Sequence, residues 1–460
     1  MKNSKNVVLF LILVLVLMWN PVTSYVYYSA HEVYDSKILS FIYWLIPIVG
    51  ILTIIYIKRK DTVSPRLEGI VFNSAYVGIL LGILILINFL IGIFTKPDAS
   101  PDEVLKREGL IFKPNSAAVY TTVEFNYRAD INSLGLRNKE VKVEKEKGTY
   151  RILCFGDSWT FGWGVDVEHS WPMQMEDYLK ANGYANVEVI NCGQGGQFTT
   201  TYAQFISKAV PVLKPDLVLV GVLQLDDLAQ LFENKLTAVK ANVNNPKIFM
   251  KAFLGASFGN YLKLIANNNG AIDIRTVWED NNKGLINDFK GLRQLRFTTL
   301  SDTIQTLFRT GNLNPGLLNN YIDFPDRVAL FNNPQLPVTQ EAIRSMTADF
   351  EKMNGVCKAT GAALMFVNLP MNYFTGHHVE RMPSDVLNAY YLENNHIDSV
   401  YAAIAQANQL PYFQLTQHFI DLTEKDKYFF KYDGHPNKAG YLEIAKEIGK
   451  HLVEAQYVKK

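Results

Sequence analysis

The sequence predicts a parallel α/β domain, with helices on both faces of its sheet, that follows an N-terminal membrane region. Short apolar runs alternate with helical segments between residues 150 and 453, and this alternation is typical of a parallel sheet covered on both faces. Long apolar runs are crowded into the first hundred residues. A Gly-Asp-Ser turn follows the first expected strand, and an Asp-Gly-His turn precedes the last expected helix.

Composition excludes several classes of function. The chain has 460 residues, with 45 Lys and Arg against 44 Asp and Glu, so its net charge of +1 gives no field that would recruit nucleic acid. Cys154, Cys192 and Cys357 are odd in number and widely spaced, which fits neither a zinc site nor a disulfide framework. We expect buried free thiols, and a Cys154–Cys192 disulfide remains open.

The predicted membrane region spans residues 1–96, with helices at about 7–28, 38–57 and 69–95. The second and third apolar runs reach the ~20 residues that a spanning helix needs. The first is ambiguous, because Lys2 and Lys5 before a short apolar run also fit a cleaved signal peptide. The apolar character resumes at residues 25–28, and this favours an uncleaved helix.

Charged residues around these helices predict their orientation. Four basic residues lie between the second and third helices: Lys58, Arg59, Lys60 and Arg66. Basic loops stay in the cytoplasm. We therefore expect a multi-pass protein of the cell membrane, with everything after Lys96 on the periplasmic or external face.

The soluble part divides into a connector and a domain. Residues 97–149 are polar and charged, and we interpret them as a juxtamembrane connector that packs on the domain edge. The domain covers residues 150–457. Its expected strands are 150–155, 187–190, 216–223, 362–368 and 412–415, and its expected helices are 170–182, 202–213, 341–360, 396–408 and 436–453. Ligands gather at the carboxyl ends of parallel strands, where the loops of Gly156, Asn191 and Gln224 follow.

An insertion at about residues 228–338 interrupts this alternation. An apolar stripe at helical spacing lies within it: Met250, Leu254, Phe258, Tyr261 and Ile265. The stripe indicates a cap subdomain with its own core. A lid over the site and a helix lying on the bilayer surface are the alternatives.

The two polar turns hold the elements of a serine nucleophile and its base. Ser158 follows Gly156-Asp157 at the start of an expected helix, where backbone N–H groups favour negative charge. Asp433 and His435 are an acid and an imidazole just before the last helix. A serine hydroxyl needs a base, and the base works best when a carboxylate orients it.

These segments together resemble the SGNH/GDSL hydrolases. The motifs are RILCFGDSWTFGWGV from residue 151, VINCGQGG from 189, DGHPNKAGYLEIA from 433 and the lead-in INSLGLRNKE from 131. The resemblance covers roughly residues 110–225 and 340–455. It implies a flavodoxin-like three-layer α/β/α fold that hydrolyses or transfers acyl esters without metal, nucleotide or other cofactor, often on O-acetylated glycans.

The resemblance also implies site residues. Ser158 is the expected nucleophile, His435 the base and Asp433 its orienting acid, while the N–H groups of Ser158 and Gly193 are the expected oxyanion donors. The chain departs from the family at Leu225, where an oxyanion Asn is expected. The neighbouring Gln224 amide is the expected substitute.

Two functions remain open at this stage. The first is an extracytoplasmic, membrane-anchored serine esterase or O-acyltransferase that acts on acyl, chiefly acetyl, esters of a surface glycan or of a small molecule. The second is an inactive scaffold of the same fold that binds glycan or a membrane-protein partner, and the missing Asn favours it. Three further groups have simpler structural interpretations. We expect His377-His378 in a surface loop and Asp226-Asp227 at the start of a helix. Trp159, Trp163 and Trp171 are interpreted as packing residues or as a platform on which a sugar stacks.

Overall fold

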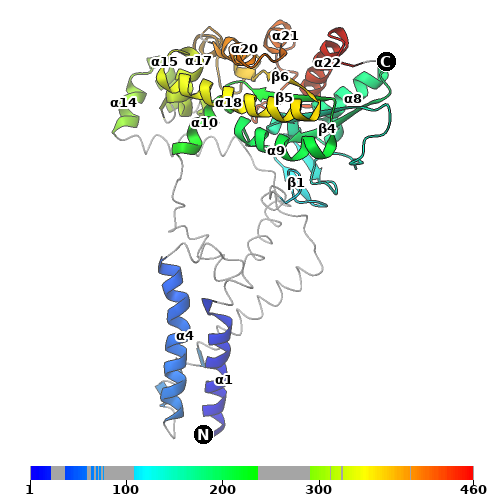
Figure 1. The fold of residues 1–460 in the computed structure, drawn as a ribbon. Helices are drawn as coiled ribbons and strands as arrows, with labels where there is room; N and C mark the ends of the chain where they lie inside the picture. Colours follow the sequence, from blue (N-terminus) through cyan, green and yellow to red (C-terminus); the bar gives the residue numbers. More distant parts are fainter. Residues whose placement is uncertain are drawn as a thin grey trace. The chain divides into compact units, whose positions relative to one another are not determined.

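The computed structural model describes residues 2–21, 37–59, scattered positions between 64 and 76, 108–236, 291–310, 312–322, 325–393 and 395–458. The described elements fall into two compact units. The first holds helices α1 (Lys2–Met18) and α4 (Lys37–Lys58). The second holds every described element from strand β1 onward (Figure 1).

The first unit covers part of the predicted membrane region. α1 and α4 pack together through a small apolar cluster of Val8, Ile12 and Ile57. They coincide with parts of the first two predicted membrane helices, and most of the third, at 69–95, lies outside the described residues. Among the described helices, none is long and apolar enough to cross a membrane.

The second unit is built on one parallel sheet of five strands. They are β3 (Tyr150–Gly156), β4 (Val187–Gly193), β5 (Leu217–Leu223), β6 (Ala363–Leu369) and β7 (Tyr412–Gln414). Their order is β4-β3-β5-β6-β7, and every pairing is parallel. This is the strand order of flavodoxin-like folds, and it confirms the predicted sheet. The order in which successive strands are added reverses between β3 and β5, because β4 lies on one side of β3 and all later strands lie on the other. Folds of this kind bind their ligands at such a point.

Helices cover both faces of the sheet (Figure 1). α8 (Trp171–Ala181), α21 (Thr416–Asp421) and α22 (Lys438–Glu454) contribute to one buried core, together with Ile152 and Cys154 of β3. Helices on the opposite face share a core with Leu153 and Phe155: α9 (Thr199–Leu213), α10 (Asp226–Leu236), α18 (Pro337–Thr360) and α20 (Ile397–Ala407). Alternate residues of one strand thus enter opposite cores, which confirms the three-layer expectation.

Several short helical elements lie within the loops that connect the strands and the longer helices. They are α7 (Ser158–Phe161), η1 (Val167–His169), η2 (Asn372–Phe374), α19 (Ser384–Leu387) and η3 (Asn388–Leu392). The last helix begins two residues later than expected, at Lys438, because the Asn437 side chain accepts the N–H groups of Ala439 and Gly440 as a cap.

The connector forms a hairpin that the sequence does not predict. Strands β1 (Ala117–Thr121) and β2 (Asn126–Asp130) pair antiparallel. Ala118, Tyr127 and Ala129 are buried in the same core as α9 and α18. The described part of the connector is therefore an integral part of the folded domain, rather than a segment that only packs on its edge.

The described part of the insertion is helical. It comprises α14 (Leu292–Thr298), α15 (Asp302–Arg309), α16 (Pro315–Ile322) and α17 (Pro325–Asn332). Phe297, Phe308 and Phe331 are buried in the common core beside α18, so this part does not form the separate core expected of a cap. The apolar stripe at 250–265 lies outside the described residues. Cys154, Cys192 and Cys357 are buried free thiols, as expected.

Candidate active site

The turn after β3 presents Ser158 at the carboxyl edge of the sheet. Asp157 caps the short helix α7 by accepting the Trp159 N–H at 2.9 Å. Gly156 lets this turn sit close to its neighbours, because a Cβ there would lie 2.1 Å from the Thr160 hydroxyl and 2.6 Å from the Gly221 carbonyl oxygen. The backbone thus fixes the position from which the Ser158 hydroxyl projects.

The structure brings the three expected catalytic side chains together across the chain. Ser158 Oγ lies 2.7 Å from His435 Nε2, and His435 Nδ1 lies 2.6 Å from Asp433 Oδ1. The Trp163 indole donates to the other Asp433 oxygen at 3.3 Å. Asp433 and His435 are separated by a single residue, and this short turn still gives the Ser–His–Asp arrangement.

The charges of the site favour a strong base. Burial alone would lower the pKa of His435, but the charge and hydrogen bond of Asp433, with the charges of Asp157 and Asp226, raise it above its ordinary value. Burial would raise the pKa of Asp433, but its contacts with His435 and Trp163 lower it. Asp433 therefore remains a carboxylate that holds His435 Nδ1–H and leaves Nε2 facing Ser158.

A second group of carboxyls, Asp157, Asp226 and Asp227, interacts electrostatically near the site. Burial, with the charge of Asp226, raises the pKa of Asp157 to about 7. Asp227 is fully buried, and it accepts the Leu223 N–H at 2.6 Å and the Tyr202 hydroxyl at 2.7 Å. Its pKa is raised by burial and by Asp157. Asp226 begins helix α10, so the pair marks a helix start, as expected.

Gly193 does not supply the free N–H expected of an oxyanion donor. Its N–H donates to Asn191 Oδ1 at 2.9 Å, and a Cβ on it would lie 2.2 Å from the Phe161 nitrogen. Gly193 therefore packs against α7. The glycine beside the nucleophile is Gly195, where an added Cβ would lie 3.6 Å from Ser158 Cβ. In the described part of the chain, Gly195 N–H donates to no other residue.

Gln224 also departs from its expected role. The fully buried side chain donates to Asp398 Oδ1 at 2.6 Å and to Thr416 Oγ1 at 2.8 Å, and it accepts the Met371 N–H at 2.9 Å. An amide nitrogen carries two hydrogens, and both are used here. Gln224 therefore ties the end of β5 to the neighbouring elements and has no donor left for an oxyanion. Leu225, which follows it, is buried at a φ of 64°.

Sequence reasoning missed two residues beside the Asp433–His435 turn. Glu124, from the hairpin β1–β2, accepts backbone N–H groups of this turn. Asn372, after β6, is buried, and its amide nitrogen lies 3.4 Å from where a Cβ on Gly434 would stand. Neither residue lies in a motif, and each reaches the site only through the fold.

The other polar and aromatic candidates have structural roles. Trp159 and Trp171 are buried, so neither offers a ring face to a sugar, whereas Trp163 is half-buried. His377 is fully buried rather than in a surface loop, and its Nδ1 contacts the Thr375 hydroxyl at 2.8 Å. Burial lowers the pKa of His377 to about 4.

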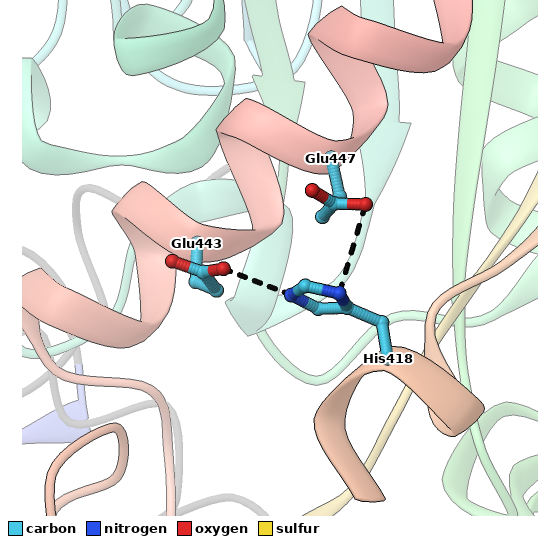
Figure 2. Close-up of side chains that lie close together, drawn as sticks. All are labelled: His418, Glu443 and Glu447. Atoms are coloured by element: carbon cyan, nitrogen blue, oxygen red, sulfur yellow. Dashed lines mark hydrogen bonds and ion pairs between the residues drawn. The ribbon is translucent and has the colours of Figure 1, made fainter. Parts of the chain in front are cut away.

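One group of described side chains has the composition of a metal site, but it lies outside the triad. His418 of α21 stands between Glu443 and Glu447 of α22 (Figure 2). His418 Nε2 lies 2.8 Å from Glu443, and Nδ1 lies 3.7 Å from Glu447. Each ring nitrogen faces a different carboxylate, so the imidazole bridges two acids instead of aiming with them at a common centre. This arrangement tethers α21 to α22.

Comparisons with known proteins find similarity at the level of structure. No family model and no curated protein sequence matches the chain. Similar solved structures include a lipase/acylhydrolase from Enterococcus faecalis, with 14% identity, coverage of 68% of this chain and 98% of that one, and a TM-score of 0.33. An esterase from Pseudoalteromonas sp. has 11% identity, coverage of 67% and 98%, and a TM-score of 0.33. An acetyl xylan esterase has 13% identity, coverage of 66% and 99%, and a TM-score of 0.31.

Proposed function

We propose that this protein is a serine esterase or O-acyltransferase that acts on acyl esters. The observation that carries the proposal is the continuous chain of contacts from Ser158 Oγ to His435 Nε2, at 2.7 Å, and from His435 Nδ1 to Asp433, at 2.6 Å. These are hydrogen-bond distances, at which the imidazole can take the hydroxyl proton as the serine attacks.

The proposed reaction has two halves. The Ser158 oxygen bonds to the acyl carbon while His435 takes its proton, and the same proton then passes to the leaving alcohol as the ester C–O bond breaks. Water or an acceptor hydroxyl next attacks the acyl-serine, with His435 again as base, and the Ser158 oxygen leaves with the proton. Water gives hydrolysis, and a sugar hydroxyl gives transfer.

The negative charge that forms on the carbonyl oxygen needs N–H donors. Ser158 N–H, at the start of α7, and Gly195 N–H, beside Ser158, are the donors this proposal uses. Neither Gly193 nor Gln224 serves, since their N–H groups are engaged elsewhere. A missing oxyanion donor typically costs about 2.7–4 kcal/mol, or ~100- to 1000-fold in rate. We therefore expect a slower enzyme than one with three donors.

Replacement of the nucleophile tests the proposal. Ser158→Ala should reduce turnover of p-nitrophenyl acetate by roughly 1000-fold or more, because the chain then lacks the atom that carries the acyl group. Ser207→Ala is the matched control, since Ser207 lies exposed on α9 and bonds only to the Ala203 carbonyl. Equal activity of the purified Ser158→Ala and wild-type proteins would refute the proposal.

An inactive scaffold is the second candidate, and the engaged state of Gly193 and Gln224 favours it. A fluorophosphonate probe distinguishes the two functions, because only an activated serine reacts quickly with it. Rapid labelling of Ser158 supports the enzyme. A folded protein that binds an acetylated glycan without labelling would be a scaffold.

The proposal also includes a class of substrate. From the motif resemblance we propose an acetyl ester of a surface glycan, or a small ester, as the substrate. Release of acetate from acetylated polysaccharide, compared with acetyl and butyryl p-nitrophenyl esters, measures this preference. A protein that cleaves only longer acyl chains would contradict it.

We further propose that the N-terminal apolar segments anchor the domain to the cell membrane, with the domain outside the cytoplasm. Apolar runs at 38–57 and 69–95, with basic residues between them, support this orientation. Lys147→Cys in the exposed connector should react with a membrane-impermeant maleimide in intact spheroplasts, and Arg59→Cys should react only after lysis. The native cysteines are buried, so we expect them not to react with the maleimide. The reverse labelling pattern would contradict the orientation.

A further inference from the structure

We infer that Glu124 is a positioning residue for the catalytic acid and base, supplied by the connector hairpin. Its carboxylate accepts the Tyr432 N–H at 3.0 Å and the Asp433 N–H at 2.7 Å. These two N–H groups belong to the turn that carries Asp433 and His435. The inference rests on the proposed function, because it gives Glu124 a role in the same triad.

The turn has little regular structure of its own to hold it. Gly434 has a φ of 84°, and the turn's own hydrogen bonds include those from Gly434 N–H to the Phe430 carbonyl, from Phe430 N–H to the His435 carbonyl and from His435 N–H to the Asp433 side chain. Glu124 adds an anchor from a segment more than three hundred residues away in sequence. Charge-assisted bonds of this kind are shorter and stronger than neutral ones.

Aromatic packing fixes the hairpin against the same site. Trp163, which donates to Asp433, makes edge contacts with Tyr120 at 4.9 Å and with Phe125 at 6.1 Å between ring centroids. Phe125 also packs on Phe430, at 5.0 Å. Glu124 lies directly before Phe125, so the packing of the hairpin sets the place of the carboxylate.

The connector also contacts helix α7, which carries the nucleophile Ser158. Arg137 is fully buried, and its guanidinium donates to the carbonyl oxygens of Phe161 and Gly162, both at 2.7 Å. These carbonyls end helix α7, which begins at Ser158. Cations stabilise helix C-termini. Connector residues therefore contact both the segment that carries the nucleophile and the turn that carries its base.

Two consequences separate positioning from general stability. Glu124 does not touch the triad side chains in the described contacts, so its loss should lower kcat through a displaced base and leave KM almost unchanged. The carboxylate also makes charge-assisted bonds, which are stronger than those of a neutral carbonyl oxygen. A neutral acceptor at this position should therefore hold the turn less firmly and give a kcat between those of the wild type and of the Ala variant.

The experiment compares Glu124→Ala and Glu124→Gln in the full chain. Glu124→Ala should reduce kcat by about 100-fold, the cost of roughly 1 Å of misplacement. Glu124→Gln keeps a carbonyl oxygen that can accept the N–H groups but loses the charge. It should lower kcat by only about 5-fold, with KM unchanged, because its neutral bonds are weaker than charge-assisted ones. Glu146→Ala is the matched control, since Glu146 is an exposed connector acid paired only with Lys142, and it should stay within about two-fold of wild type.

The outcomes are decisive in each direction. An active wild type, with Glu124→Ala indistinguishable from Glu146→Ala in kcat and KM, would overturn the positioning role alone. If Glu124→Ala does not fold, Glu124→Gln decides: a lowered kcat at unchanged KM supports the inference, and a wild-type kcat overturns it. A wild type with no Ser158-dependent activity would instead refute the proposed function.

Discussion

Replacement of Gly193 tests whether this residue is a packing position rather than an oxyanion donor. An added Cβ would lie 2.2 Å from the Phe161 nitrogen, 2.5 Å from the Thr160 carbonyl carbon and 2.8 Å from Phe161 Cα. All three atoms belong to the backbone of the segment that starts at Ser158. A backbone cannot rotate out of the way as a side chain can, so the helix or the loop must move.

The size of that movement follows from the contacts. Ordinary van der Waals contact for a Cβ begins near 3.4 Å, so the 2.2 Å approach must open by more than 1 Å. Overpacking of this kind typically costs about 1–3 kcal/mol in the free energy of unfolding. A displacement of roughly 1 Å at the nucleophile costs about 100-fold in rate. Gly193→Ala should therefore lose stability and activity together.

Thermal unfolding and kcat/KM on p-nitrophenyl acetate measure the two effects. Gly195→Ala is the matched control, because its Cβ would meet Ser158 Cβ at 3.6 Å, an ordinary contact. It should keep the wild-type melting temperature, with any loss confined to activity. A Gly193→Ala protein with wild-type stability and wild-type activity would refute the packing argument.

Three further predictions concern the base and the end of β5. The pKa of His435 is raised above its ordinary value of 6.5. The base must be neutral to act, so kcat/KM should fall as the pH drops through that raised pKa, and the acid limb should lie above pH 6.5. An acid limb below pH 6.5 would contradict the arrangement. Gln224→Ala should lower the free energy of unfolding by about 1–3 kcal/mol, measured by urea unfolding, since it removes the hydrogen bonds that the buried Gln224 side chain makes to Asp398, Thr416 and Met371. Leu225→Asn should lower stability without raising kcat, because Leu225 lies in the apolar core; a rise of about 100-fold would show that the position faces the oxyanion.

Regular elements of the domain could be predicted from the sequence because local patterns determine them. The run at residues 217–223 is apolar throughout, and β5 (Leu217–Leu223) occupies it as a strand buried on both faces. The Gly-Asp-Ser and Asp-Gly-His turns were placed at element ends, where the structure has them. Their meeting at 2.7 Å follows from the parallel sheet, whose loops gather at one edge.

The roles of Gly193 and Gln224 could not be predicted in the same way. Asn191 lies two residues from Gly193, but only the folded loop shows that its side chain takes the Gly193 N–H. The partners of Gln224 are Asp398 and Thr416, more than 170 residues away. A local motif shows that a donor is present, but it does not show whether another acceptor already holds it.

Leu225 and the partners of Gln224 together determine the structure at the end of β5. A leucine at a φ of 64° carries a strain of about 1–3 kcal/mol that a glycine or asparagine would largely avoid. The bonds of Gln224 on one side, and the burial of Leu225 in the core on the other, offset that strain. The end of β5 is therefore stabilised by its own contacts, and the Gln224 amide is not free to bind a ligand. The donors of an oxyanion hole must then come from the loops after β3 and β4. The rate then depends on the two N–H donors of Ser158 and Gly195, and on the geometry that Asp433 and, by our inference, Glu124 give to the His435 turn.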